Sequence, residues 1–227
     1  IFDPFSGSGT TLLEANVNGL DAYGTEIDDI AKLIIKVKTT VLDSAQMKLL
    51  DQCYSEIINI IGQDDVKLFT PAIVNLEHWF SENTINELGR IKAYIDNIED
   101  EDVRDFFKLC MASIIKKVSN ADDTSPKPYV SNKIIKVPPT VEKEFTSVFR
   151  RYKQMMQELT HVKKMGNTVI IQGDALEFSV PLGIDLAITS PPYINAFDYG
   201  RTMRLENLWL DTLTEEMLRK KKSQYVG

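Results

Sequence analysis

The chain has 227 residues, of which 43% are hydrophobic and 26% charged, the composition of an ordinary soluble globular protein with a sizeable core. Its net charge of −7 argues mildly against a pure nucleic-acid-binding module. Cys53 and Cys110 are too far apart to suggest a disulfide framework or a cysteine-rich zinc site. The two histidines are isolated, and no apolar run approaches the roughly 18–20 residues that cross a bilayer. We therefore expect a cytoplasmic protein without a metal site or a membrane partner.

The first 41 residues predict a strand, a glycine-containing turn, a helix, a second strand and a second helix. The apolar pair at residues 1–2 leads into the turn, and Thr10 is the expected N-cap of the first helix. A strand over residues 21–26 and a helix over residues 29–41 follow. This βαβ pattern favours a parallel sheet.

The middle of the chain, residues 42–165, has helical periodicity. Residues 119–139 form a polar, proline-rich loop, and loops of this length are commonly functional. Residues 108–171 carry twelve basic and five acidic side chains, a net charge of +7. This segment fits the backbone of double-stranded DNA and a role in target recognition, although a solvated charged surface explains the same charge. The helices are expected over residues 45–61, 84–98, 103–118 and 141–165.

The α/β pattern returns at residues 166–227. A β-branched strand is expected over residues 168–172, and a second one over residues 184–189. The latter is apolar after its second residue, as is typical of a buried parallel strand. Helices are expected over residues 204–213 and 214–222.

A glycine turn and an acid suggest a nucleoside cofactor. Gly7-Ser8-Gly9 lies between a strand and a helix start, where backbone N–H groups can approach a polar ligand. Such a turn alone is weak evidence. Glu26 at the end of the next strand is placed to accept hydrogen bonds from ribose hydroxyls, although an exposed carboxylate at a strand end is the simpler alternative.

A second cluster, Ser190-Pro191-Pro192-Tyr193, follows the apolar strand directly. Two prolines make a rigid turn at the carboxyl end of a strand, where open α/β sheets bind ligands. The Ser190 hydroxyl and free carbonyls can accept hydrogen bonds, and the Tyr193 ring offers a surface on which a base can stack. An incidental proline-rich loop is the alternative.

These residues resemble the amino-group DNA methyltransferases over residues 1–30 and 168–209. Residues 2–11 are similar to the family's cofactor motif, residues 24–27 to its ribose motif and residues 173–175 to its adenine motif. The resemblance implies that S-adenosylmethionine is bound, with Glu26 on the ribose, Ile27 on the adenine ring and Asp174 on its amine. The cofactor-binding residues implied are Asp3, Pro4, Phe5, Ser6, Gly7, Gly9, Thr10, Thr11, Glu26, Ile27, Asp174 and Ala175.

Residues 188–193 are similar to the family's catalytic motif in its serine-first form, which is typical of N4-cytosine enzymes. The implied reaction methylates the exocyclic amine of a flipped-out DNA base, with N4 of cytosine favoured and restriction–modification as the context. Adenine N6, an RNA base and a cofactor-binding subunit without turnover stay open as alternatives. Cytosine C5 chemistry is excluded, because neither cysteine follows a proline. The catalytic residues implied are Ser190, Pro191, Pro192 and Tyr193.

The resemblance implies a Rossmann-like, seven-stranded methyltransferase sheet, of which four strands are predicted here. Residues 1–41 would form the cofactor-binding half, residues 42–165 a helical insertion and residues 166–227 the catalytic half. The chain begins inside a strand without a methionine and stops after a lysine cluster. We therefore expect one piece of a larger or split polypeptide, with the remainder of a methyltransferase or a restriction-system subunit as its partner.

Overall fold

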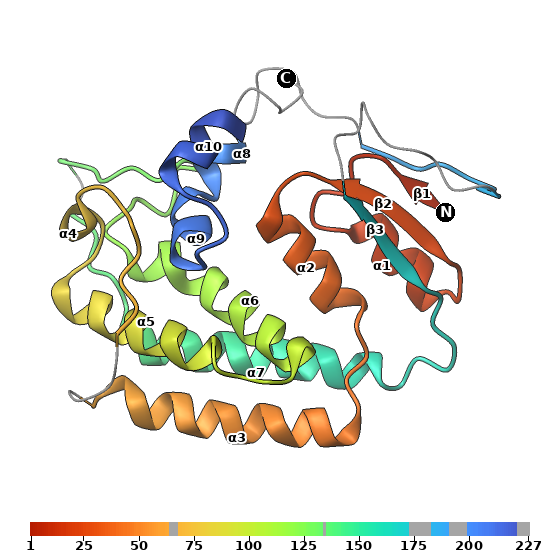
Figure 1. The fold of residues 1–227 in the computed structure, drawn as a ribbon, viewed down its shortest axis with the longest axis horizontal. Coiled ribbons are helices and arrows are strands. Elements are labelled where there is room, and N and C mark those ends of the chain that lie inside the picture. The colour runs from red at the N-terminus through yellow and green to blue at the C-terminus, as the bar shows by residue number, and fades with distance from the viewer. Residues whose placement is uncertain (64–67, 134, 173–182, 191–198, 222–227) are drawn as a thin grey trace.

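The computed structural model of the protein describes residues 1–63, 68–133, 135–172, 183–190 and 199–221 (Figure 1). In this part of the chain, a small parallel sheet and a larger group of helices lie side by side. The protein is therefore of the mixed α/β class. None of the described helices is long and apolar enough to cross a membrane.

The strands of the described sheet pair in parallel and in chain order, as the βαβ pattern predicts. Tyr23 in the middle strand lies opposite Phe2 on one side and Val169 on the other. All the strands therefore end at the same edge of the sheet, and the turns that follow them are brought together. The strands are β1 (Phe2–Asp3), β2 (Ala22–Glu26) and β3 (Thr168–Gln172).

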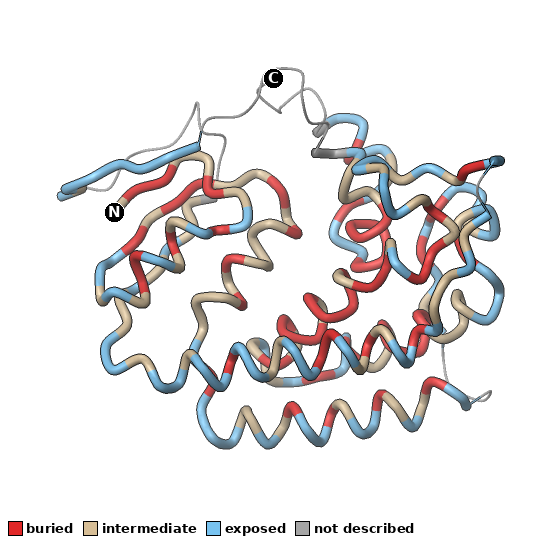
Figure 2. The backbone as a smooth tube through the Cα atoms, turned by 180° about the vertical axis from the view of Figure 1, so that it is seen from behind, coloured by how far each residue is buried: buried red, intermediate tan, exposed pale blue. Residues whose placement is uncertain are grey.

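The segment over residues 184–189, predicted as a buried strand, lies at the edge of the sheet beside β1 (Figure 2). Its position next to β1 agrees with a parallel strand, because Phe2 N donates to Leu186 O and Ile188 N donates to Phe2 O, both at 2.9 Å. The predicted burial is wrong, since Leu186 is 50% exposed and Ile188 is 47% exposed. β1 is two residues long and forms a single bridge with this segment, and the described residues leave the segment half uncovered.

Two helices cover one face of the sheet, and their ends are fixed by local hydrogen bonds. Thr10, predicted as an N-cap, is instead the first helical residue, because Gly9 takes the cap position in a left-handed conformation. Asp28 caps the second helix by accepting a main-chain N–H of its first turn at 2.9 Å. This helix ends earlier than predicted, at Thr39, because Thr40 adopts an extended conformation. The hydroxyls of Thr39 and Thr40 donate to carbonyls near the end of the helix. The helices are α1 (Thr10–Val17) and α2 (Asp29–Thr39).

The helical part is built around one central helix, α6, which is buried along most of its length (Figure 2). Its Phe107 ring stacks on Phe149 of α7, with centroids 5.9 Å apart. Helix α7 ends at Leu159 rather than at the predicted residue 165. At this end, the Thr160 hydroxyl donates to a carbonyl of the last turn. The short α4 was not predicted, because four residues carry no detectable period. The helices are α3 (Ser44–Ile61), α4 (Leu76–Trp79), α5 (Glu82–Ile95), α6 (Glu101–Val118) and α7 (Val141–Leu159).

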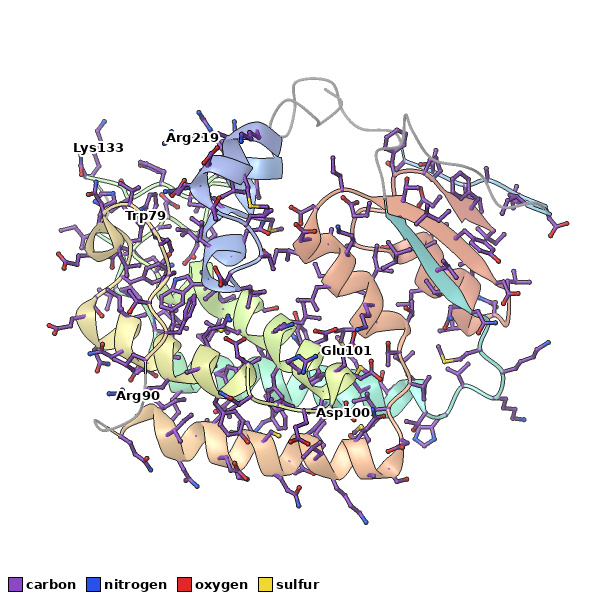
Figure 3. All side chains as sticks on the ribbon, in the orientation of Figure 1. Trp79, Arg90, Asp100, Glu101, Lys133 and Arg219 are labelled. Carbon is purple, nitrogen blue, oxygen red and sulfur yellow. The ribbon has the colours of Figure 1, made fainter. Side chains whose placement is uncertain are left out.

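Helix α2 belongs to both parts of the protein. Ile35 packs beneath the sheet, whereas Ile30 and Val37 lie in the core of the helical part. Lys36 forms an ion pair with Glu101 at the start of α6, which Figure 3 shows beside α2. The sheet and the helices are thus connected through one shared helix.

The last described helices return to this helical core. Trp209 is fully buried and meets the Phe80 ring edge to face, with centroids 5.6 Å apart. Its helix is shorter than predicted and ends before Asp211, which takes a positive φ of 56°. The helices are α8 (Tyr199–Thr202), α9 (Arg204–Trp209) and α10 (Glu215–Lys221).

Candidate active site

The turn between β1 and α1 contains two glycines in the left-handed region, with φ of 51° at Gly7 and 76° at Gly9. A Cβ on Gly9 would lie 2.6 Å from Cγ1 of Ile35, so this glycine lets α2 pack against the turn. A Cβ on Gly7 would meet nothing within 4 Å. Gly7 therefore faces open space, and its main chain is accessible to a ligand.

Asp3 organises this turn from the end of β1, where it is buried at 3% exposure. Its Oδ1 accepts a hydrogen bond from Phe5 N at 3.1 Å. Its carbonyl accepts one from the Ser6 hydroxyl at 2.9 Å, and Ser6 N donates to Thr25 O at 3.1 Å. The turn is thus fixed to the neighbouring strand before any ligand binds.

Gly24 of β2 permits this close contact. A Cβ at this position would lie 2.1 Å from the Ser6 hydroxyl oxygen and 2.8 Å from Leu12 Cδ1. The resemblance in sequence includes Gly24 in the ribose motif, but its described role is to let the turn lie against the strand.

Glu26 ends β2 with a carboxylate that is largely engaged by the main chain. Its Oε1 accepts hydrogen bonds from Ile27 N and Asp28 N, each at 2.8 Å, and the Gly7 N–H also interacts with the carboxylate. Burial raises the pKa of Glu26 and the neighbouring Asp28 carboxylate adds to this, while the three N–H groups oppose the rise. Glu26 is therefore a partly buried, oriented acceptor, unlike an exposed strand-end carboxylate. A carboxylate has about four acceptor positions, so three donors leave capacity for a ligand hydroxyl.

Thr189 brings the second cluster to this turn. Its hydroxyl donates to Asp3 Oδ1 at 2.8 Å, the same oxygen that holds the turn. Ser190 follows directly and is exposed. The start of the Ser190 cluster and the glycine turn therefore lie beside each other at one edge of the sheet.

The other predicted site residues divide into two groups. The end of β1, the glycine turn and the first turn of α1 contain Asp3, Pro4, Phe5, Ser6, Gly7, Gly9, Thr10 and Thr11, and Ile27 follows Glu26 directly. The predicted residues that lie outside the described part of the chain are Asp174, Ala175, Pro191, Pro192 and Tyr193.

Two curated proteins match nearly the whole chain. Over 230 residues, 93% of this chain and 50% of the relative, it is 30% identical to the Type II methyltransferase M.MvaI of Kocuria varians. Over 239 residues, 92% of this chain and 47% of the relative, it is 27% identical to the Type II methyltransferase M.BsoBI of Geobacillus stearothermophilus. The chain is therefore similar in sequence to two Type II methyltransferases.

The chain spans about half the length of these curated relatives. No family model matches it. No solved structure matches it either.

Two contacts near the turn were not predicted from the sequence. Thr189 was predicted as the last residue of a strand and as part of the catalytic motif, but its contact with Asp3, which spans 186 positions, was not predicted. Lys38 of α2 donates to Ser8 O at 3.0 Å, and burial lowers the pKa of its ammonium. Neither contact has a local sequence signal, because each depends on how distant elements pack.

No group of three or more His, Cys, Asp or Glu side chains within the described ranges is arranged to hold a metal ion. Cys53 and Cys110 are both buried free thiols, and burial is the main cause that raises the pKa of each.

Proposed function

We propose that the protein transfers a methyl group from S-adenosylmethionine to the exocyclic amine of a base flipped out of double-stranded DNA. The target is N4 of cytosine, and the context is restriction–modification. The observation that carries the proposal is the hydrogen bond from Thr189 to Asp3, which joins the turn suited to a cofactor to the Ser190 cluster suited to a base. The similarity to two Type II methyltransferases supports the reaction class.

The residues present fit the proposed cofactor. The open space at Gly7 would admit a ligand against the main chain, and the spare acceptor capacity of Glu26 suits ribose hydroxyls. Asp3, Phe5 and Gly9 would line the methionine end, Ile27 would pack on the adenine, and Asp174 would accept from its amine. Bound S-adenosylmethionine would supply an electrophilic methyl group on a sulfonium centre.

The residues of the Ser190 cluster would activate the amine. An exocyclic amine is a poor nucleophile, since its lone pair is delocalised into the ring. Acceptors at the Ser190 hydroxyl and the Pro191 carbonyl would hold the amine hydrogens and favour a pyramidal nitrogen. The Tyr193 ring would stack on the flipped base, whose extrusion from the duplex costs roughly a few kcal/mol. The chain would thus accelerate the reaction by positioning and by stronger hydrogen bonds in the transition state.

The choice of cytosine over adenine rests on residue 190. The serine-first form resembles N4-cytosine enzymes, whereas adenine-N6 enzymes more often have Asp or Asn at this position. Adenine N6 is the second candidate within the same class, and the identity of the methylated nucleoside separates the two.

The helical segment at residues 42–165 would contribute DNA contacts and part of target recognition. Four basic residues of this segment are exposed and form no ion pair among the described residues. Figure 3 shows one of them, Lys133, pointing outward from the helical part, and Arg219 of α10 also points outward there. Such side chains would grip phosphates and position the duplex without reading its sequence. The four residues are Lys127, Lys133, Arg150 and Arg151.

The direct test is transfer of a radiolabelled methyl group from S-adenosylmethionine to plasmid DNA. Wild-type protein should leave the label in the DNA, and Ser190→Ala should lose most of this transfer while binding the cofactor normally. Ser113→Ala is a matched control, because Ser113 lies in α6, where its hydroxyl donates to Leu109 O. Absence of label with the wild-type protein, or an equal rate in Ser190→Ala, would contradict the proposal.

A further inference from the structure

Glu206 is a buried acid that the proposed reaction does not use. It lies in the first turn of α9 at 7% exposure, and its Oε2 has no hydrogen-bond partner among the residues that the structure describes. An unpaired carboxylate in such a place is costly, so the neutral acid is the better-tolerated form. Burial therefore favours the protonated, neutral form of Glu206.

Helix α9 packs against α6, α2 and α8. Among the described residues, the charged side chains whose electrostatic interaction changes the pKa of Glu206 are Lys116 of α6 and Asp28 at the start of α2. The Lys116 ammonium donates to Ser125 O and is thus engaged elsewhere. Burial raises the pKa of Glu206 to about 7, with the Asp28 carboxylate also raising it, and the N–H of Glu206 itself and Lys116 oppose the rise.

Asp28 links Glu206 to the proposed cofactor site. Its side chain caps α2, and its N–H donates to Glu26 Oε1 at 2.8 Å. A charge on Glu206 would repel the Asp28 carboxylate and disturb the cap. Because the same residue orients Glu26, the disturbance would reach the acceptor proposed for the ribose.

We propose that Glu206 is a positioning residue, which in its protonated form lets α9 pack against the cap of α2 and thereby holds Glu26 in place for the cofactor. The inference rests on the proposed function. Loss of the proton would weaken cofactor binding through Asp28. Glu206 is not a catalytic residue, because it touches neither the proposed substrate nor the proposed cofactor.

The first test needs no cofactor. A carboxyl group whose pKa is raised in the folded protein stabilises it fully below the unfolded pKa and loses that contribution as pH rises through about 7. Urea unfolding gives the equilibrium constant for unfolding at each pH. Between pH 5 and pH 8 this constant should increase in the wild-type protein by a factor on the order of 100 larger than in Glu206→Gln. Equal pH dependence in both proteins would overturn the inference.

The second test measures the affinity for S-adenosylmethionine by calorimetry at pH 6 to 8.5. We expect the affinity of the wild-type protein, relative to that of Glu206→Gln, to decrease as the pH rises. Dividing the wild-type affinity by the variant affinity at each pH cancels any titration of the ligand. Glu206→Met, neutral and of similar length, should behave like Glu206→Gln and replaces it if that variant does not fold. Glu216→Gln, at an exposed position on α10, is the control and should follow the wild type.

The two tests separate the inference from the proposed function. If the wild-type protein binds no S-adenosylmethionine at any pH, the proposed cofactor is wrong, whatever the unfolding data. If it binds the cofactor with the same pH profile as both Glu206 variants, the role of Glu206 is wrong and the proposed function stands.

Discussion

Thr189 and Asp3, 186 positions apart, are joined by a hydrogen bond of 2.8 Å from the threonine hydroxyl to Asp3 Oδ1. Asp3 is buried and uses the same oxygen to hold the glycine turn through Phe5 N. One carboxylate therefore connects the two halves of the proposed site. A substitution at Thr189 should therefore affect both the glycine turn and the Ser190 cluster.

Thr189→Val removes this bond while keeping the shape of the side chain. We expect the free energy of unfolding to fall by about 1.5–3 kcal/mol, the range for a hydrogen bond to a charged group, and methyl transfer to fall with it. Thr189→Ser keeps the hydroxyl and should stay close to the wild type. Urea unfolding and transfer rates measure both effects, and equal values for Thr189→Val and Thr189→Ser would mean that the bond has no role.

The two glycines of the turn should respond differently to alanine. Both substitutions place a side chain in the left-handed region, at a cost of about 1–2 kcal/mol. Gly9→Ala should cost more, because its Cβ would lie 2.6 Å from Ile35. Gly7→Ala should fold, since its Cβ meets open space, but it should bind S-adenosylmethionine more weakly. Thermal unfolding and calorimetry separate the two effects, and unchanged binding by Gly7→Ala would place the cofactor elsewhere.

Glu26→Ala should raise the dissociation constant of S-adenosylmethionine by about 10- to 100-fold, the loss expected for hydrogen bonds to a charged acceptor. Glu14→Ala, at an exposed position on α1, is the matched control. Burial raises the pKa of Glu26, so this carboxylate gains a proton at a pH above the usual carboxyl range. The affinity of the wild-type protein for S-adenosylmethionine should therefore decrease when the pH is lowered through that range. Calorimetry over a pH series measures this affinity. Equal binding by Glu26→Ala and the wild type would mean that Glu26 does not bind the ribose of the cofactor.

The exposed basic residues should determine how DNA binding depends on salt. Lys127→Ala/Lys133→Ala and Arg150→Ala/Arg151→Ala should each weaken binding to all sequences and flatten the salt slope by about 0.9 per lost phosphate contact. Lys117→Ala/Lys153→Ala is the matched control, because Glu144 and Asp51 already neutralise these lysines. DNA affinity over a salt series measures the slope, and an unchanged slope in both test pairs would mean that these residues do not touch DNA.

The sequence predicted the elements that local patterns determine. Apolar periodicity was sufficient to predict β2, β3 and α3 to within a residue, the start of α2 and the position of α6. The exposure of residues 184–189 was missed because an apolar run indicates a strand, whereas its burial depends on which elements lie over it. Thr10 was assigned as a cap because its hydroxyl suits the position, but Gly9 takes the left-handed turn one residue earlier.

The candidate site divides in the same way. The glycine turn and Glu26 are local features, and they could be placed from strand–turn–helix order alone. The contacts of Thr189 with Asp3 and of Lys38 with Ser8 join residues that only the packed sheet brings together. No sequence signal marks Glu206 either, because a glutamate in an amphipathic helix is ordinarily solvent-exposed. Its burial in α9, which packs against α2 and α6, is a tertiary property.

The identity of the modified nucleoside is the sharpest test of the proposed reaction. Plasmid DNA incubated with the protein and isotopically labelled S-adenosylmethionine would be digested to nucleosides and analysed by mass spectrometry. We predict labelled N4-methylcytosine with the wild-type protein, and none with Ser190→Ala. Labelled N6-methyladenine would move the target to adenine, whereas 5-methylcytosine or unlabelled DNA would contradict the proposed chemistry of this site.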